Sequence, residues 1–85
     1  MQDKFNNAVA RSKQLPQKPS NEELLNLYSL FKQASDGDVR GDRPGGFDFK
    51  AIAKHDAWST LKGMSKEEAT EKYIALVDDL HNKYA

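Results

Sequence analysis

Apolar residues recur with a period of about 3.6 residues in four separate segments of this 85-residue chain, and no segment alternates with period two. The first pattern is typical of amphipathic helices, whereas the second is typical of half-buried strands. A chain of this length has the size of one domain. The sequence therefore predicts an all-α fold in which residues 1–85 form a single domain of four helices.

The first two helices are separated by a proline-containing segment. The first is expected to end near Leu15, because the prolines that follow lack the amide hydrogen that a helix interior needs. Its face consists of Phe5, Ala8, Val9 and Ser12. The second begins with a capping box, in which the Ser20 hydroxyl and the Glu23 carboxylate satisfy free backbone amides. It should stop near Asp36–Gly37, and its stripe consists of Leu24, Leu27, Tyr28 and Phe31.

The second half of the chain contains a long loop and two further helices. Residues 37–47 are rich in glycine and are expected to form the loop. The third helix is expected from about Asp48 to Lys62, with Gly63 as its stop. Its buried side consists of Ala57, Trp58 and Leu61. The fourth begins at a second capping box, Ser65–Glu68, and carries the most regular stripe: Ala69, Tyr73, Leu76, Val77, Leu80 and Tyr84.

Composition argues against several classes of function. Lysine plus arginine and aspartate plus glutamate each total 13, so the formal net charge is zero. A neutral chain lacks the basic field that non-specific binding to nucleic acid or membranes needs, so we expect no nucleic-acid partner and no stable membrane insertion. No stretch approaches the length of about 20 apolar residues that spans a membrane, and the first residues lack the apolar run of a signal peptide. The chain has no cysteine, and we expect a cytoplasmic monomer.

Candidate catalytic and metal-binding residues are few. His55 and His81 are the only histidines, and neither belongs to a nucleophile or metal motif, so we expect no enzyme activity, cofactor or metal. Residues 36–41 begin like an EF-hand calcium loop, but the pattern then fails. Arg40 and Phe47 occupy positions five and twelve of that loop, where oxygen ligands are needed. An acidic turn is the expected structure of this segment.

Lysines and aromatic residues share helix faces in two segments. Tyr28 and Lys32 are four residues apart, as are Lys50 and Lys54, and Trp58 follows one turn later. In one interpretation, the rings belong to the core and the lysines to its solvated rim. In the other, they form a phosphate site, because ammonium groups pair with phosphate oxygens and an aromatic face can stack a base. Spacing alone leaves both interpretations open.

Several separated blocks resemble the acyl-CoA-binding protein family, and together they cover nearly all of the chain. They are Lys18-Pro19, Tyr28-Ser-Leu-Phe-Lys-Gln-Ala-Ser-Asp-Gly-Asp38, Arg43-Pro-Gly45, Asp48-Phe-Lys50, Ala53-Lys-His-Asp-Ala-Trp58, Leu61-Lys-Gly63 and Tyr73-Ile-Ala-Leu-Val77. The resemblance implies a four-helix, up-down-down-up bundle with a shallow bowl between helices. It also implies an intracellular carrier and pool buffer that binds medium- to long-chain acyl-CoA esters and performs no chemistry on them.

The resemblance also implies which residues hold the ligand. Tyr28, Lys32 and Lys54 would hold the adenosine 3′-phosphate and stack on or flank the adenine. Lys13 and Lys50 would lie at the rim of the cofactor. The remaining contacts would come from Phe31, beside the nucleotide, and from Tyr73 on the fourth helix.

Two positions depart from the family pattern. Phe31 stands where the family usually has tyrosine, so a hydrogen bond is lost while stacking remains. His55 replaces an aromatic residue, commonly tryptophan, which puts some packing in doubt. A helical module that docks a peptide or protein partner is the alternative function, and the preferred acyl-chain length is not encoded in any of these motifs.

Overall fold

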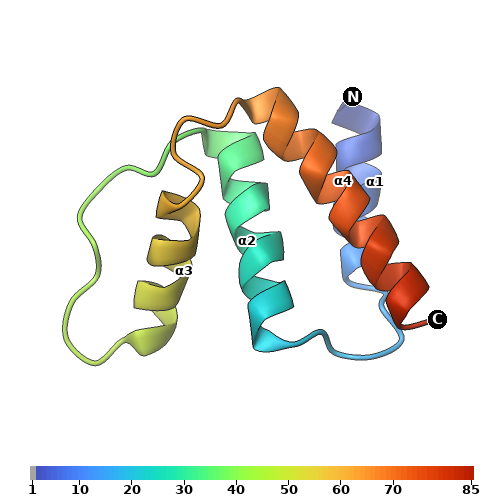
Figure 1. Cartoon of the computed structure of the whole chain (residues 1–85), viewed down its shortest axis with the longest axis horizontal. Helices are drawn as coiled ribbons and strands as arrows, with labels where there is room; N and C mark the ends of the chain where they lie inside the picture. The colour runs from blue at the N-terminus through green and yellow to red at the C-terminus, as the bar shows by residue number, and fades with distance from the viewer. Residues whose placement is uncertain (1) are drawn as a thin grey trace.

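Each of the four predicted helices is present in the computed structural model, which describes residues 2–85 (Figure 1). The helices are α1 (Gln2–Ser12), α2 (Asn21–Asp36), α3 (Phe49–Ser59) and α4 (Lys66–Lys83), and no strand occurs among the described residues. In Figure 1, α2 and α3 run in the same direction and opposite to α1 and α4. The predicted all-α, up-down-down-up arrangement is therefore confirmed.

The helix starts are set by side-chain caps. At α2, the Glu23 amide donates to the Ser20 hydroxyl at 3.1 Å, and the Ser20 amide donates to the Glu23 carboxylate at 2.9 Å, so the predicted capping box is complete. At α4 the Glu68 amide donates to Ser65 Oγ at 3.0 Å, while the Glu68 carboxylate lies 3.9 Å from the Lys72 ammonium. The second predicted box therefore forms only its serine half.

Two helices end three residues earlier than predicted, and the reason is the same in both. At the end of α1, Ser12 Oγ donates to the Val9 carbonyl at 2.7 Å, which is the carbonyl that the Lys13 amide would need if the helix continued. The Lys13 amide turns instead to the Ala10 carbonyl at 3.2 Å. At the end of α3, the Thr60 hydroxyl donates to the Ala57 carbonyl, which is the carbonyl that the Leu61 amide would need if the helix continued.

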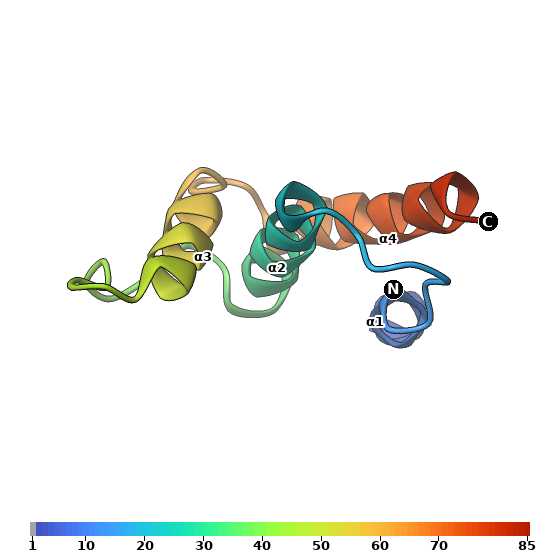
Figure 2. The ribbon, with the colours of Figure 1, turned by 90° about the horizontal axis from the view of Figure 1, so that it is seen from below.

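The helices form a row with one helix set to its side. Figure 2 shows α3, α2 and α4 next to one another, with α1 on one side of the row; α1 packs against α4, and α3 packs against α2. The core lies where α1, α2 and α4 meet, and its buried residues are Phe5, Ala8, Leu27, Tyr73, Val77 and Leu80. Because α3 lies outside this core, it packs on α2 alone among the helices.

The predicted stripes are covered to different extents. In α4, Ala69, Tyr73, Val77 and Leu80 are buried, as predicted. Of the predicted α2 stripe, only Leu27 is buried; Leu24 is 37% exposed and Phe31 is 36% exposed. Leu27 therefore belongs to the core, whereas Leu24 and Phe31 leave apolar surface on α2 uncovered.

A buried polar side chain that the stripes did not predict joins α3 to the rest of the molecule. Gln33 has no exposed surface, and its amide oxygen accepts from Trp58 Nε1 at 3.0 Å. Its amide nitrogen donates to Asp38 Oδ1 at 2.9 Å and to the Met64 carbonyl at 2.8 Å. Asp38 also accepts from the Gly63 amide at 2.8 Å, and this amide, followed by Gln33, lowers the pKa of the Asp38 carboxyl. The acidic turn thus joins the two loops that flank α3.

Within residues 2–85, no helix combines the length and the apolar character that crossing a membrane requires.

Candidate ligand-binding site

A groove of about 580 Å³ runs between α2 and α3. Helical spacing places its lining residues on facing sides of the two helices, because residues three or four apart share a face. Toward the start of both helices the lining is apolar apart from Asn21 and Lys50, and Tyr28 and Lys54 lie at the other end. It consists of Asn21, Leu24, Leu25 and Tyr28 from α2, and Phe49, Lys50, Ala53 and Lys54 from α3.

Two lysine–aromatic pairs connect α2 and α3, and they are crossed. The Lys54 ammonium on α3 lies 5.2 Å from the centre of the Tyr28 ring on α2. One turn further along both helices, the Lys32 ammonium on α2 lies 5.0 Å from the centre of the Trp58 ring on α3. A cation over an aromatic face contributes about 0.5–1 kcal/mol at exposed sites. The crossed pairs therefore align the two helices and hold two ammonium groups on one side of the molecule.

Lys32 has an acidic partner as well as an aromatic one. Its ammonium lies 2.5 Å from Asp36 Oδ2, one turn along the same helix. This ammonium lowers the pKa of the Asp36 carboxyl. A phosphate that approached Lys32 would therefore compete with an exposed carboxylate, which is a weak competitor in water.

A second aromatic group lies where α2 meets α1 and α4. The Phe31 ring stacks on Phe5 with 5.9 Å between ring centres, and the Tyr73 ring lies tilted 6.3 Å from Phe31. Tyr73 is only 3% exposed, and its hydroxyl donates to Ser12 Oγ at 3.2 Å. Phe31 is thus the partly uncovered member of an aromatic cluster whose other members are buried.

The structure therefore divides the predicted site residues into groups. Tyr28, Lys50 and Lys54 line the groove, and Lys32 lies one turn beyond it. Phe31 and Tyr73 belong to the neighbouring aromatic cluster, and their placement depends on α1 and α4. The last predicted residue, Lys13, is exposed just after α1 and does not line the groove.

The predicted site omitted most of the apolar lining of the groove: Leu24, Leu25, Phe49 and Ala53. Leu24 was instead assigned to a helix stripe. The sequence did carry a signal at Phe49, because a phenylalanine directly before Lys50 at the start of a helix repeats the pairing of a ring with a lysine. A second depression, of about 460 Å³, lies between α2, α3 and α4 and lacks such lysine–aromatic pairs.

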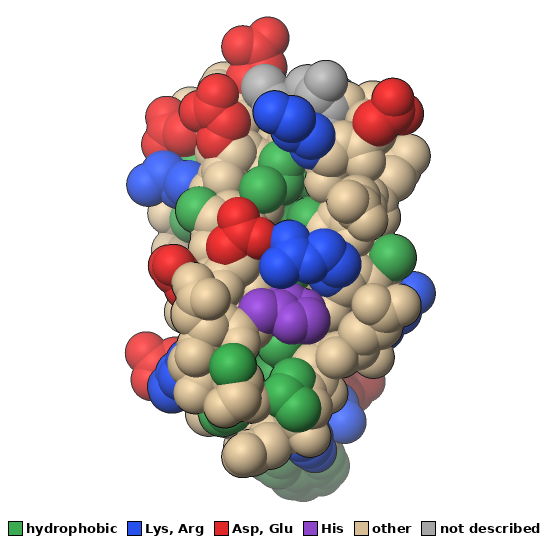
Figure 3. Space-filling view, turned by 90° about the vertical axis from the view of Figure 1, so that its right-hand side faces the viewer, with side chains coloured by type: hydrophobic (Ala, Val, Ile, Leu, Met, Phe, Trp, Pro, Cys, Tyr) green, Lys and Arg blue, Asp and Glu red, His purple; other side chains and the backbone are tan. Residues whose placement is uncertain are grey.

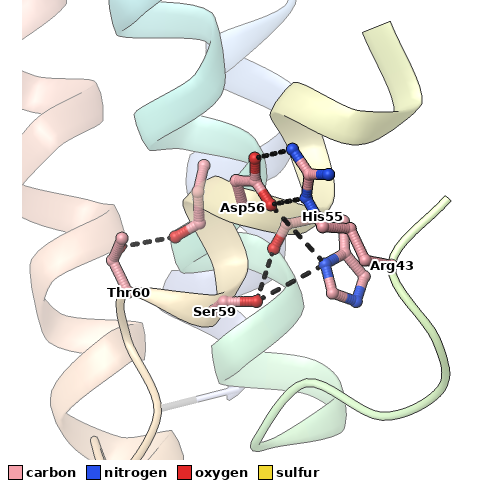
Figure 4. Close-up of polar contacts among 6 residues, drawn as sticks. Arg43, His55, Asp56, Ser59 and Thr60 are labelled. Atoms are coloured by element: carbon pink, nitrogen blue, oxygen red, sulfur yellow. Dashed lines mark hydrogen bonds and ion pairs between the residues drawn. The ribbon is translucent and has the colours of Figure 1, made fainter. Parts of the chain in front are cut away.

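Ser59, His55 and Asp56 lie close together on α3, but their geometry does not form a catalytic relay (Figure 4). Ser59 Oγ is 3.5 Å from His55 Nδ1, and Asp56 Oδ1 is 3.9 Å from the same nitrogen. A relay needs the serine and the carboxylate on opposite ring nitrogens. His55 Nε2 is buried and has no hydrogen-bond partner among the described residues.

The carboxylate of Asp56 has a different role, which is to fix the loop between α2 and α3. Arg43 donates to Asp56 from Nε at 2.8 Å and from a terminal nitrogen at 3.0 Å (Figure 4). This bidentate pair lowers the pKa of the Asp56 carboxyl. In the part of the chain that the structure describes, no three His, Asp or Glu side chains are grouped to hold a metal ion.

The face made by α1 and α4, at the other end of the molecule from α3, carries side chains of both charges. Figure 3 shows the face made by α1 and α4, on which acidic, basic and apolar side chains are interspersed. There Arg11 pairs with Asp78 at 2.5 Å, and His81 Nε2 lies 2.8 Å from the Arg11 carbonyl. These contacts attach α1 to α4, and none of their residues lines the α2–α3 groove.

Comparison of the sequence with known proteins identifies a family and several similar relatives. A family model described as "Acyl CoA binding protein" matches residues 2–77. The chain is 48% identical over 81 residues to an acyl-CoA-binding protein of Dictyostelium discoideum, covering 95% of this chain and 96% of the relative. It is 50% identical over 80 residues to acyl-CoA-binding protein homolog 1 of Caenorhabditis elegans, covering 94% and 93%.

Solved structures agree with the sequence comparison. The crystal structure of acyl-CoA-binding protein 2 of Oryza sativa superposes with a TM-score of 0.92 at 44% identity, covering 96% of this chain and 91% of that one. The crystal structure of the corresponding protein of Moniliophthora perniciosa gives 0.91 at 41% identity, covering 99% and 83%. With a family match over most of its length, relatives at about half identity and the same fold, this chain belongs to the acyl-CoA-binding protein family.

Proposed function

We propose that this protein binds medium- to long-chain acyl-CoA esters and serves as their carrier and pool buffer, without chemical change to the ester. The observation that carries the proposal is the α2–α3 groove, which is apolar at one end and bordered by two lysine–aromatic pairs at the other. An acyl-CoA ester has the matching polarity, with a hydrocarbon tail and a phosphorylated nucleotide. The names of the relatives support the same ligand.

The acyl chain is assigned to the apolar end of the groove, against Leu24, Leu25, Phe49 and Ala53. Burial of ten methylenes contributes about 8 kcal/mol gross, at about 0.8 kcal/mol each. The loss of translational and rotational freedom on association offsets several kcal/mol of this. The tail therefore tunes affinity by its length, whereas recognition of the ester as a CoA derivative falls to the nucleotide.

The nucleotide is assigned to the lysine–aromatic end. Lys32 and Lys54 would pair with the 3′-phosphate, at about 1.5–3 kcal/mol for each charge-assisted hydrogen bond. Tyr28 would stack on the adenine, at about 1–3 kcal/mol. Phe31 would flank the base, with Tyr73 as the support behind its ring. The lysines at the rim would be Lys50, at the groove, and Lys13, after α1.

The remaining features of the proposal concern the whole protein. We infer that residues 1–85 act as one binding domain, as a cytoplasmic monomer that needs no cofactor. The absence of a relay at Ser59 and His55 supports a binding protein rather than a thioesterase (Figure 4). Recovery of intact thioester after prolonged incubation with the protein is the expected result, and release of free CoA would contradict it.

Calorimetry with a matched pair of ligands tests the nucleotide assignment. Palmitoyl-CoA and 3′-dephospho-palmitoyl-CoA share the tail and differ only in the phosphate assigned to Lys32 and Lys54. We expect the dephospho ester to bind more weakly by a factor of roughly ten to a hundred, since one or more charge-assisted hydrogen bonds are lost. Equal affinities would contradict the assignment of the 3′-phosphate to Lys32 and Lys54. If neither ester binds, the proposed function itself is contradicted.

A further inference from the structure

Two phenylalanines stand out from the surface at the end of the loop that leads into α3. Phe47 is 91% exposed and Phe49 is 70% exposed, far more than the other exposed large apolar side chains of the described residues. Their rings meet edge to face with 6.3 Å between centres. In Figure 1 the loop swings away from the helices and returns at the start of α3, and the pair lies at this return, because Phe49 is the first residue of α3.

Neither the core nor the groove accounts for Phe47. The core cluster contains no residue of this loop, and the groove is lined by Phe49 but not by Phe47. A positive φ of 70° at Gly46 turns the chain directly before Phe47, and Arg43 anchors the loop to Asp56 on α3. The loop is therefore held by its own contacts, and these contacts leave the Phe47 ring in water.

The exposed charged side chains nearest the pair in sequence include Asp42, Arg43, Asp48 and Lys50, of which Lys50 is the nearest cation. Lys50 follows Phe49 directly and is exposed. The nearest acidic side chain in sequence, Asp48, accepts a hydrogen bond from the Ala51 amide at 3.2 Å and so faces the start of α3. Elsewhere in the loop, Arg43 is neutralised by Asp56. The local pattern is thus a pair of aromatic rings bordered by one lysine whose ammonium is available.

We propose that Phe47 and Phe49 form a wedge that inserts into the interfacial layer of a phospholipid bilayer, with Lys50 at the level of the lipid phosphates. Aromatic side chains beside a lysine suit this layer, because the rings enter the apolar boundary while the ammonium stays among headgroups. A stable protein partner would have to cover about 800 Å² on each side, which two exposed rings do not offer. A bilayer closes around exposed rings without a complementary shape.

The wedge is continuous with the groove, so the membrane contact could serve the transfer of acyl chains. This role in transfer rests on the proposed function. Phe49 and Lys50 belong both to the wedge and to the lining of the groove, so insertion would bring the apolar end of the groove to the membrane. An acyl chain could then pass between bilayer and groove with little exposure to water. The membrane contact itself needs no ligand, and it is therefore tested on the protein alone.

The test is flotation of the ligand-free protein with vesicles of phosphatidylcholine and phosphatidylserine. We expect the wild-type protein to float with the vesicles, and Phe47→Ser to lower its partition coefficient roughly tenfold, since one inserted ring is lost. Ala10→Ser serves as a control, because it adds a hydroxyl at an exposed position of α1, away from the loop, and should leave partition unchanged. In Phe47→Trp, quenching by brominated lipid should exceed the background of Trp58, which is buried.

Calorimetry with palmitoyl-CoA separates this proposal from the proposed function. Phe47→Ser should bind the ester as the wild type does, since Phe47 does not line the groove. Equal flotation of wild type and Phe47→Ser would overturn the wedge. It would also be overturned if the wild type sediments as a dimer and Phe47→Ser as a monomer, because the two rings would then contact a second copy of the chain. Flotation that depends on Phe47 in a protein that binds no ester would support the wedge and overturn the proposed function.

Discussion

At the scale of single residues, the crossed pairs show how a lysine and an aromatic ring can share a helix face. Tyr28 is half-buried and Lys54 is exposed, so the ring and the ammonium are both accessible at the groove. The two interpretations of the spacing are therefore not exclusive. The tyrosine packs on its neighbours with part of its ring, and the remaining part faces the groove together with the lysine.

Substitution of Lys54 by alanine tests its assigned role. We expect Lys54→Ala to weaken palmitoyl-CoA binding by about 1.5–3 kcal/mol, which is roughly ten- to a hundredfold, because the charge-assisted hydrogen bond is lost. The melting temperature should change little, since the side chain is exposed. Lys4→Ala, at an exposed position of α1, is the control for removal of a positive charge. A similar loss of affinity in both variants would show that the net charge of the protein, and not a contact made by Lys54, determines the effect.

Tyr28→Ala distinguishes a ligand contact from a core residue. We expect a larger effect on ligand binding than on stability, because the groove side of the ring is lost as a stacking surface. Calorimetry and thermal unfolding on the same preparation provide the two measurements. A variant that mainly unfolds at lower temperature, while still binding the ester once folded, would assign the ring to the core.

At the scale of helices, a buried polar network joins α3 to the rest of the molecule. Gln33 connects α2 to the Trp58 indole, to Asp38 in one loop and to Met64 in the other. Buried polar groups that are fully paired specify one arrangement, because every alternative leaves a donor or acceptor without a partner. Gln33 thus helps to fix the position of α3 on α2, although it does not line the groove.

Gln33→Leu is expected to destabilise the protein by about 2–3 kcal/mol, because the Met64 carbonyl loses its partner inside the protein. Trp58 Nε1 keeps a second acceptor, the Gly37 carbonyl at 2.9 Å, so the indole does not lose all its hydrogen bonds. Urea unfolding followed by circular dichroism gives the free energy of unfolding. Gln14→Leu, at an exposed position after α1, is the control, and equal stability of both variants would contradict the role of Gln33.

At the scale of the whole molecule, the start of α2 is tied to the end of α4 through one carboxylate. Glu23 accepts from the Lys83 ammonium at 2.7 Å, from the Tyr84 hydroxyl and from the Ser20 amide. These contacts, with Lys83 the strongest, lower the pKa of the Glu23 carboxyl to about 2. The same residue therefore caps one helix and anchors another that is distant in sequence.

The lowered pKa predicts how this tie responds to acid. Above a pH of about 4.5, Glu23 is ionised in both the folded and the unfolded chain, so its contribution to stability is complete. As the pH falls from about 4.5 toward 2, the unfolded chain takes up the proton first, and the contribution is progressively lost. The difference in urea midpoint between wild type and Glu23→Gln should therefore be largest at neutral pH and shrink toward pH 2. A difference that does not vary with pH would show that the charge of Glu23 is not involved.

Much of the fold follows from local sequence, whereas the candidate site residues came from a family resemblance. The period of the apolar residues predicted four helices, the Ser20 and Asp48 caps determine where α2 and α3 start, and Gly37 ends α2 with a positive φ of 84°. The three groove residues Tyr28, Lys50 and Lys54 were predicted by their resemblance to a family. The predicted ends of α1 and α3 were three residues too late, because the ends depend on hydroxyl groups that compete for single backbone carbonyls.

By itself, the sequence determined the elements: which segments form helices, where caps begin them, and which face of each is apolar. Only the tertiary structure decided which apolar faces are covered. The stripe of α4 is enclosed by α1 and α2, whereas the stripe of α2 extends past the core to a helix that packs on α2 alone. Periodicity records that a face is apolar, but burial depends on what lies opposite. That is why Tyr73 is a core residue while Leu24, on an equally apolar stripe, lines the groove.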